Sequence, residues 1–210
     1  MNPVPLVARR RWLLRVVVAL IAVNATYLMV QVLWDEPEIA LEMGGTYEDM
    51  SSQSTARFSP LIRGHIWFGV PKTDARLRFI DTQYGFVTPA ARFFTVNFDD
   101  NIIDGIRISP QVEPLLLEGA LKVVLDLQDQ WRSGGWAVLY PKDNPPFADT
   151  PEWRARIRDA NNGEITYWQA GYKYQILLGM SRFKDSKRPQ EERYLITLGL
   201  GKPWLTSHAE

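Results

Sequence analysis

Three acidic residues and an asparagine lie close together in the sequence: Asp99, Asp100, Asn101 and Asp104. Their oxygens are of the kind that Ca²⁺ binds, and paired carboxylates also act as general acid and base in hydrolases. However, the spacing lacks the alternating ligands and the distal glutamate of an EF-hand loop. Asp and Asn are also the residues that a tight turn favours for its backbone. We therefore predict a turn and no metal site, and a carboxylate-dependent envelope hydrolase is the least favoured function.

Residues that could carry other catalytic chemistry are few. The chain has no cysteine and two histidines, which excludes thiol catalysis, disulfides and metal sites rich in cysteine or histidine. A serine triad would need His65 or His208, and His65 lies beside Trp67 in a strand-like segment that favours a partly buried structural role. The chain has no nucleophile elbow, zinc-protease motif or glycine-rich phosphate loop. We therefore predict a protein that is not an enzyme, with no catalytic residue, cofactor or metal.

Aromatic and arginine side chains gather in the stretch from residue 153 to residue 174. Tryptophan, tyrosine and arginine dominate the energetic centres of protein interfaces, and a groove for a glycan or peptide uses similar residues. The competing interpretation is that alternate side chains of a predicted hairpin face the core and the rest are ordinary surface. The candidate partner-binding residues are Trp153, Arg154, Arg158, Trp168 and Tyr172.

A second candidate surface is the stretch 182–193, which mixes both signs of charge and contains Pro189. This composition is typical of a solvated connection between two strands. An interaction role for this stretch is the alternative.

The elements that must position these residues follow from hydrophobic periodicity. Period-two or β-branched runs predict strands, and apolar residues three and four apart predict helices. Thr150 and Pro151 predict the cap and first residue of the second helix, and Trp131 and Trp136 are expected in the core. The expected strands are 65–70, 76–80, 93–98, 102–108, 136–140, 164–169, 172–183 and 193–200, with a short extended segment at 84–89; the expected helices are 114–132 and 152–160.

An apolar run without formal charge covers residues 16–34. A helix of this length spans just under ~30 Å, which matches the hydrocarbon core of a bilayer. A cleaved signal peptide and a buried core helix are the alternatives, but the run has no small-x-small cleavage site and no polar stripe. The residues expected at the membrane interface are Arg9, Arg10, Arg11, Trp12, Arg15 and Trp34.

Charge is distributed unevenly along the chain, although the 24 basic and 24 acidic residues cancel. Residues 1–34 hold four arginines and no acid, so the remainder has 20 bases against 24 acids and a net charge of −4. The positive-inside rule then places residues 1–11 in the cytoplasm and exports residues 35–210. Because the exported part has neither cysteine nor a glycosylation sequon, we expect a bacterial inner membrane and a periplasmic domain. Its mild acidity argues against a nucleic-acid partner.

These patterns together predict an α+β fold: a single N-terminal transmembrane helix, then one exported domain whose antiparallel sheet packs on the main helix at 114–132. Residues 35–60 are rich in Gly, Ser and Pro and are expected to be a juxtamembrane linker, with a short helix near 47–53 as an alternative. The expected organisation is a basic arm at 1–11, a signal-anchor helix at 12–34, the linker at 35–60 and the periplasmic domain at 61–210.

The expected function is non-enzymatic binding of a protein partner at the periplasmic face of the inner membrane. The favoured form is an immunity protein that neutralises an envelope-acting bacterial toxin, because such a protein needs complementarity and no chemistry. The alternative is an accessory or assembly subunit of a cell-envelope complex. In that case Asn24 and Gln31 would be polar contact points between membrane helices.

Overall fold

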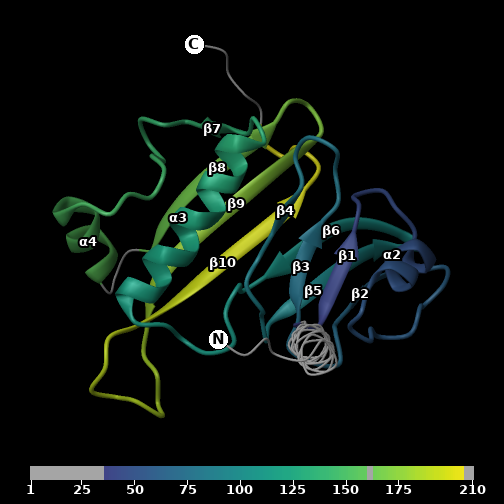
Figure 1. Cartoon of the computed structure of the whole chain (residues 1–210), viewed down its shortest axis with the longest axis horizontal. Coiled ribbons are helices and arrows are strands. Elements are labelled where there is room, and N and C mark those ends of the chain that lie inside the picture. Colours follow the sequence, from purple (N-terminus) through teal and green to yellow (C-terminus); the bar gives the residue numbers. More distant parts are fainter. Residues whose placement is uncertain (1–35, 160–162, 206–210) are drawn as a thin grey trace, which may run out of the picture. The chain divides into compact units, whose positions relative to one another are not determined.

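The computed structural model describes residues 36–159 and 163–205, which form an α+β domain with three helices and two sheets (Figure 1). The predicted α+β class is confirmed. Within these two ranges no helix has both the length and the apolar character needed to cross a bilayer. The predicted span at 12–34 lies outside the described residues, and so do its flanking residues Arg9, Arg10, Arg11, Trp12, Arg15 and Trp34.

A seven-stranded sheet, here called the large sheet, forms one layer of the domain. Its strand order is β2-β5-β6-β10-β9-β8-β7, and every neighbouring pair is antiparallel. Asp100 turns the β5–β6 hairpin with a φ of 53°, which agrees with the turn predicted from residues 99–101. The strands are β2 (Ile66–Gly69), β5 (Phe94–Asp99), β6 (Ile102–Ile108), β7 (Ala137–Leu139), β8 (Glu164–Ala170), β9 (Tyr174–Phe183) and β10 (Arg193–Gly201).

A three-stranded sheet, here called the small sheet, is built from the first part of the described chain. Strand β1 (Glu38–Leu41) pairs in parallel with β3 (Arg76–Phe79), which pairs antiparallel with β4 (Phe86–Val87). The short helix α2 (Tyr47–Gln53) contacts β1. The range 35–60 therefore differs from the expected linker, since β1 is fully buried and paired with a strand far along the chain. The possible helix at 47–53 is present.

The main helix α3 (Leu117–Ser133) buries one face and ends before Gly134 and Gly135, of which Gly135 has a φ of 82°. It starts later than the expected Pro114, because Leu115 instead exchanges two backbone hydrogen bonds with Tyr194 of β10. The second predicted helix is α4 (Pro151–Arg158), and Thr150 caps it by accepting from the backbone N of Trp153 at 3.3 Å, as expected.

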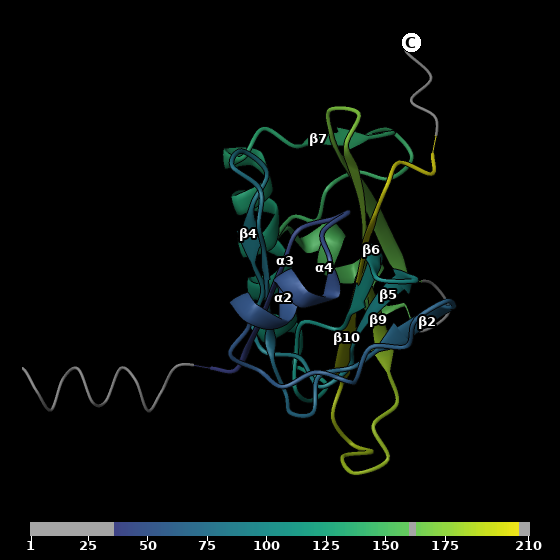
Figure 2. The same cartoon turned by 90° about the vertical axis from the view of Figure 1, so that its right-hand side faces the viewer.

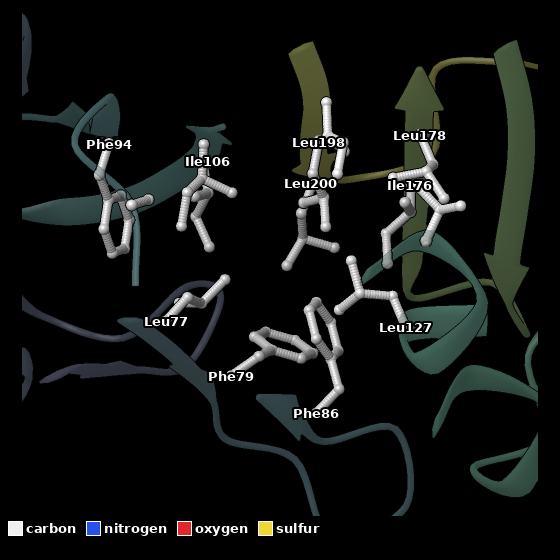
Figure 3. Close-up of a cluster of buried hydrophobic side chains, with 14 of the residues drawn as sticks. Leu77, Phe79, Phe86, Phe94, Ile106, Leu127, Ile176, Leu178, Leu198 and Leu200 are labelled. Carbon is white, nitrogen blue, oxygen red and sulfur yellow. The ribbon is translucent and has the colours of Figure 1, made fainter. Parts of the chain in front are cut away.

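The core lies between the large sheet and a second layer made of α3 and the small sheet. Figure 2 shows α2, α3 and β4 on one side of the large sheet. In Figure 3, Phe79 and Phe86 of the small sheet and Leu127 of α3 point toward side chains such as Leu200 and Ile176 of the large sheet. Trp131 and Trp136 belong to this buried cluster, as predicted for the point where helix meets strand. The large sheet thus has one covered face, and its opposite face is here called the outer face.

Candidate functional site

Two of the predicted partner-binding residues lie in the interior. Trp168 is 1% exposed, and its ring centroid lies 5.5 Å from that of Trp131. Trp153 is 9% exposed and packs on Phe147, with a centroid distance of 5.1 Å. Period-two alternation along β8 places Trp168 on the covered face, and the inner side of α4 carries Trp153. These two side chains therefore serve packing and present no surface to a partner.

The three other predicted residues lie on the surface in different settings. Arg154 of α4 forms ion pairs with Glu118 and with Asp149, at 2.6 Å from its Nε to Asp149 Oδ1. The hydrogen bonds that Arg154 donates to these carboxylates, chiefly those to Glu118, raise the pKa of its guanidinium. Arg158 Nε lies 3.5 Å from Glu192, and Tyr172, at the β8–β9 turn, is 94% exposed. A partner-binding role for these three residues stays a prediction, and the structure does not join them to Trp153 and Trp168 in one surface.

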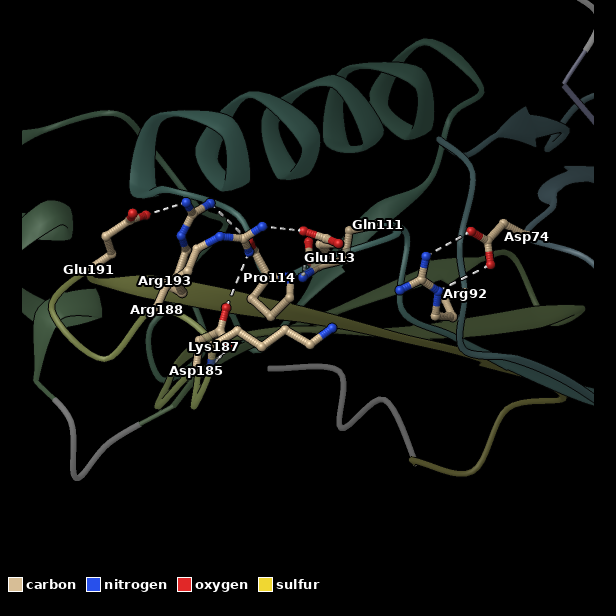
Figure 4. Close-up of polar contacts among 10 residues, drawn as sticks. All are labelled: Asp74, Arg92, Gln111, Glu113, Pro114, Asp185, Lys187, Arg188, Glu191 and Arg193. Atoms are coloured by element: carbon tan, nitrogen blue, oxygen red, sulfur yellow. Dashed lines mark hydrogen bonds and ion pairs between the residues drawn. The ribbon is translucent and has the colours of Figure 1, made fainter.

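The connection between β9 and β10, residues 184–192, is tied to the segment that precedes α3 (Figure 4). Arg188 donates to Glu113 at 2.6 Å and to Asp185 at 3.3 Å, and the hydrogen bond from Arg188 lowers the pKa of Glu113. Asp185 is buried and also accepts from the backbone N of Lys187 at 2.9 Å. Most of this connection is exposed, as a solvated loop should be, but its start is anchored by one buried carboxylate.

Two of the three acidic residues near the β5–β6 turn, Asp100 and Asp104, have structural partners. Asp100 Oδ1 accepts from the backbone N of Gly64 at 2.6 Å, and Asp104 pairs with Lys202 at 2.8 Å. Over the described ranges, no group of three or more His, Cys, Asp and Glu side chains could hold a metal ion. His65, expected to be partly buried, is exposed because it precedes β2, and its carbonyl accepts from the backbone N of Asp100.

The outer face of the large sheet carries large apolar side chains in contact with water. Ile66 and Phe68 of β2 are 84% and 69% exposed, whereas Trp67 between them is buried against Phe98. Phe93, which precedes β5, and Ile102, which begins β6, are also exposed. No helix or strand within 36–159 and 163–205 lies over this face, which forms the right-hand side of the domain in Figure 2. Exposed apolar groups that cluster in this way mark surfaces for interaction.

A hollow of about 630 Å³ opens in the middle of the outer face. Its floor is β6 and β10, where Arg107 lies directly across from Gly199, and Trp204 forms part of its wall just after β10. Asn97 of β5 and Thr197 of β10 add an amide and a hydroxyl to the lining. The Asp104–Lys202 ion pair lies among the same lining residues.

The hollow has the chemistry of a binding site, with one free guanidinium, two neutral polar groups and an indole. Arg107, Asn97 and Thr197 have no side-chain hydrogen bond or ion pair to any other described residue. These groups can therefore donate hydrogen bonds to acceptor atoms of another molecule that enters the hollow. Comparison of this chain with protein-family models, with curated proteins and with solved structures finds no match.

Sequence reasoning missed this surface, although one signal for it was present. The segment Leu198-Gly199-Leu200-Gly201 alternates leucine with glycine inside a strand, so that over these four residues one face of β10 is apolar and the other has no side chains. Glycine weakens a strand interior and often marks a place where another molecule or backbone approaches closely. The contributions of Asn97 and Trp204 could not be found in this way, because they come from separate segments.

Proposed function

We propose that this chain is a non-enzymatic protein-binding domain that docks its partner on the outer face of the large sheet. The observation that carries the proposal is the set of exposed apolar side chains on a sheet face that no described helix or strand covers. Ile66 and Phe68 supply apolar area of the kind that interface centres bury, and the polar hollow beside them supplies specificity. The proposed location is the periplasmic face of a bacterial inner membrane, with residues 12–34 as the anchor.

The favoured form of this function is an immunity protein that covers the active site of an envelope-acting toxin. A broad sheet face suits this task, since blocking an active site needs shape and charge complementarity over a wide area. An excess of four acids over residues 35–210 favours a basic toxin surface, which such charge would attract. The second candidate, an accessory subunit of a cell-envelope complex, would use the same face and would also need the membrane helix itself.

Site-specific photo-crosslinking in cells that produce the full chain tests the docking face. A photoreactive phenylalanine analogue replaces Phe68 on the outer face or, as a control, Leu116 at the start of α3. The two side chains are similarly exposed, at 69% and 52%. We expect one distinct protein adduct from position 68 and none of that mass from position 116. The absence of an adduct at 68, or the same adduct at both positions, would contradict the proposal.

The identity of the adduct then separates the two forms of the function. A secreted enzyme supports the immunity protein, and deletion of the gene should then harm cells that carry the active toxin. A set of inner-membrane proteins supports the accessory subunit. Replacing residues 12–34 with an unrelated span should leave an immunity protein active but should impair a subunit that uses Asn24 and Gln31 as helix contacts.

A further inference from the structure

The hollow in the outer face contains a positive charge with no described partner. Arg107 lies in β6, an interior strand of the large sheet, between Thr95 of β5 and Gly199 of β10, and its side chain is exposed. The one acidic side chain that lines the hollow, Asp104, is already paired with Lys202 at 2.8 Å. A guanidinium presents several donors in a planar fork that matches a carboxylate. The charge of the hollow is therefore complementary to an acidic group.

From this geometry we infer that the hollow receives an aspartate or glutamate side chain from an extended segment of the partner protein, with Arg107 as its anchor. The inference rests on the proposed docking function and names the chemistry of its central contact. Asn97 and Thr197, which also lack described side-chain partners, lie around the same hollow and complete the set of polar groups for the incoming carboxylate.

Gly199 leaves open space in the hollow beside Arg107. A Cβ atom built on Gly199 would meet nothing within 4 Å, and Gly199 is not among the glycines with positive φ. Neither packing within the domain nor backbone conformation therefore requires glycine at this mid-strand position. The missing side chain leaves room beside Arg107 for the atoms of another molecule.

The surroundings of the hollow indicate what flanks the acidic residue. Phe68 lies directly across from Asn97 in the sheet and is 69% exposed, and Trp204 is 47% exposed on the wall. An acidic side chain in the hollow would thus have apolar surface next to it, which fits neighbouring apolar residues of an extended segment. A free small carboxylate would leave Phe68 uncovered, so it is an alternative for the test.

The test compares two capped pentapeptides, acetyl-Ser-Val-Asp-Phe-Ser-amide and its twin with asparagine in place of aspartate. Binding to the purified full chain in mild detergent is measured by calorimetry at low salt, with 3-phenylpropionate as the small carboxylate. We expect the aspartate peptide to bind at least about tenfold more tightly than its twin, as charge-assisted hydrogen bonds would give. Equal affinity or no binding overturns the inference, and so does 3-phenylpropionate binding as tightly as the peptide.

Two variants and a control connect the peptide to the hollow. Arg107→Gln should remove the preference for aspartate, whereas Arg92→Gln, an exposed arginine that pairs with Asp74 elsewhere, should keep it. In Gly199→Val the new side chain fills the open space of the hollow. We expect this variant to bind the peptide at least about tenfold more weakly than the wild type, with no decrease in its melting temperature. A preference for aspartate that survives in Arg107→Gln would overturn the anchor.

The outcome is distinguishable from failure of the proposed function. If Arg107→Gln keeps the crosslink from position 68 and the wild-type chain shows no preference for the aspartate peptide, the result supports the docking face and contradicts the acidic contact at Arg107. If the wild-type chain gives no specific crosslink from position 68, the docking proposal itself fails.

Discussion

At the scale of single residues, Asp81 shows how a buried carboxylate organises its surroundings. Its Oδ1 accepts from the backbone N of Gln83 at 2.8 Å and of Tyr84 at 2.9 Å, and its Oδ2 accepts from the Tyr174 hydroxyl at 3.0 Å. Burial raises the pKa of Asp81, but these hydrogen bonds and the nearby Lys173 ammonium together outweigh burial, and the pKa lies below its ordinary value. The ionised form is therefore the one that stabilises the fold.

Replacement of Tyr174 by phenylalanine removes one of these hydrogen bonds. We expect Tyr174→Phe to lower the free energy of unfolding by about 1.5–3 kcal/mol near neutral pH, because the acceptor is charged. A depressed folded pKa contributes stability above the unfolded pKa, and this contribution is lost as pH falls through the folded pKa. The difference between variant and wild type should therefore shrink in acid. Urea unfolding across the acidic range measures it, and a difference that stays constant would contradict this explanation.

Trp168 and Phe68 form a second residue-scale test, because one aromatic ring is 1% exposed and the other 69%. We expect Trp168→Ala to cost about 3–5 kcal/mol of folding stability, since it opens a cavity in the core. Phe68→Ala should change stability by less than about 0.5 kcal/mol yet weaken partner capture. Chemical denaturation and co-purification measure the two effects. If Phe68→Ala unfolds the domain, Phe68 would be a core residue rather than part of the docking face.

At the scale of elements, glutamine side chains bind the backbone of segments far from them in the sequence. Gln128 of α3 is fully buried, donates to the carbonyl of Phe147 at 2.8 Å and accepts from its backbone N at 2.8 Å. Gln130 makes the same two contacts with Val87 of β4, and Gln111 bridges Tyr194 and Ile196 of β10. Each amide both donates and accepts a backbone hydrogen bond, as a neighbouring strand would. Side chains therefore help to attach a loop and the small sheet to α3.

Substitution of Gln128 by methionine tests this attachment. The change keeps the length and removes the amide, so two buried backbone groups of Phe147 lose their partners. We expect a loss of about 2–4 kcal/mol in stability, because each unsatisfied buried group costs about 1–3 kcal/mol. Gln53→Met, at an exposed position at the end of α2, is the matched control and should be nearly neutral. Equal effects in thermal unfolding would show that the amide does not hold the loop.

At the scale of the whole domain, both sheets and α3 share one core, as the side chains in Figure 3 show. Leu77 of the small sheet and Leu178 of the large sheet are both fully buried in it. A shared core predicts that the two sheets unfold together, although they have no strand in common.

We therefore expect Leu77→Ala and Leu178→Ala each to lower the midpoint temperature of one unfolding transition that both sheets share. Each change should lower the free energy of unfolding by about 2–5 kcal/mol. For a domain of this size, each kcal/mol lowers the melting temperature by roughly 2–4 °C. Circular dichroism and tryptophan fluorescence should report coincident melting curves. A separate early transition in Leu77→Ala alone would mean that the small sheet is an independent unit.

Much of the local structure could be predicted from neighbouring residues. The cap at Thr150 and Pro151, the turn at Asp100 and the apolar period of α3 depend on contacts within a few positions, so the sequence reveals them directly. The pairing of β1 with β3 could not be found in this way. It joins Glu38 to Arg76 across 38 positions, and polar, glycine-rich surroundings hide the buried residues 39–41.

The candidate site depended on tertiary structure for a physical reason. Alternation along a strand separates two faces, but it does not say which face another layer covers. The sequence therefore could not show that Trp168 points into the core while Phe68 points to solvent. Nor could it bring Asn97, Arg107, Gly199 and Trp204 together, because strand order places these distant segments side by side.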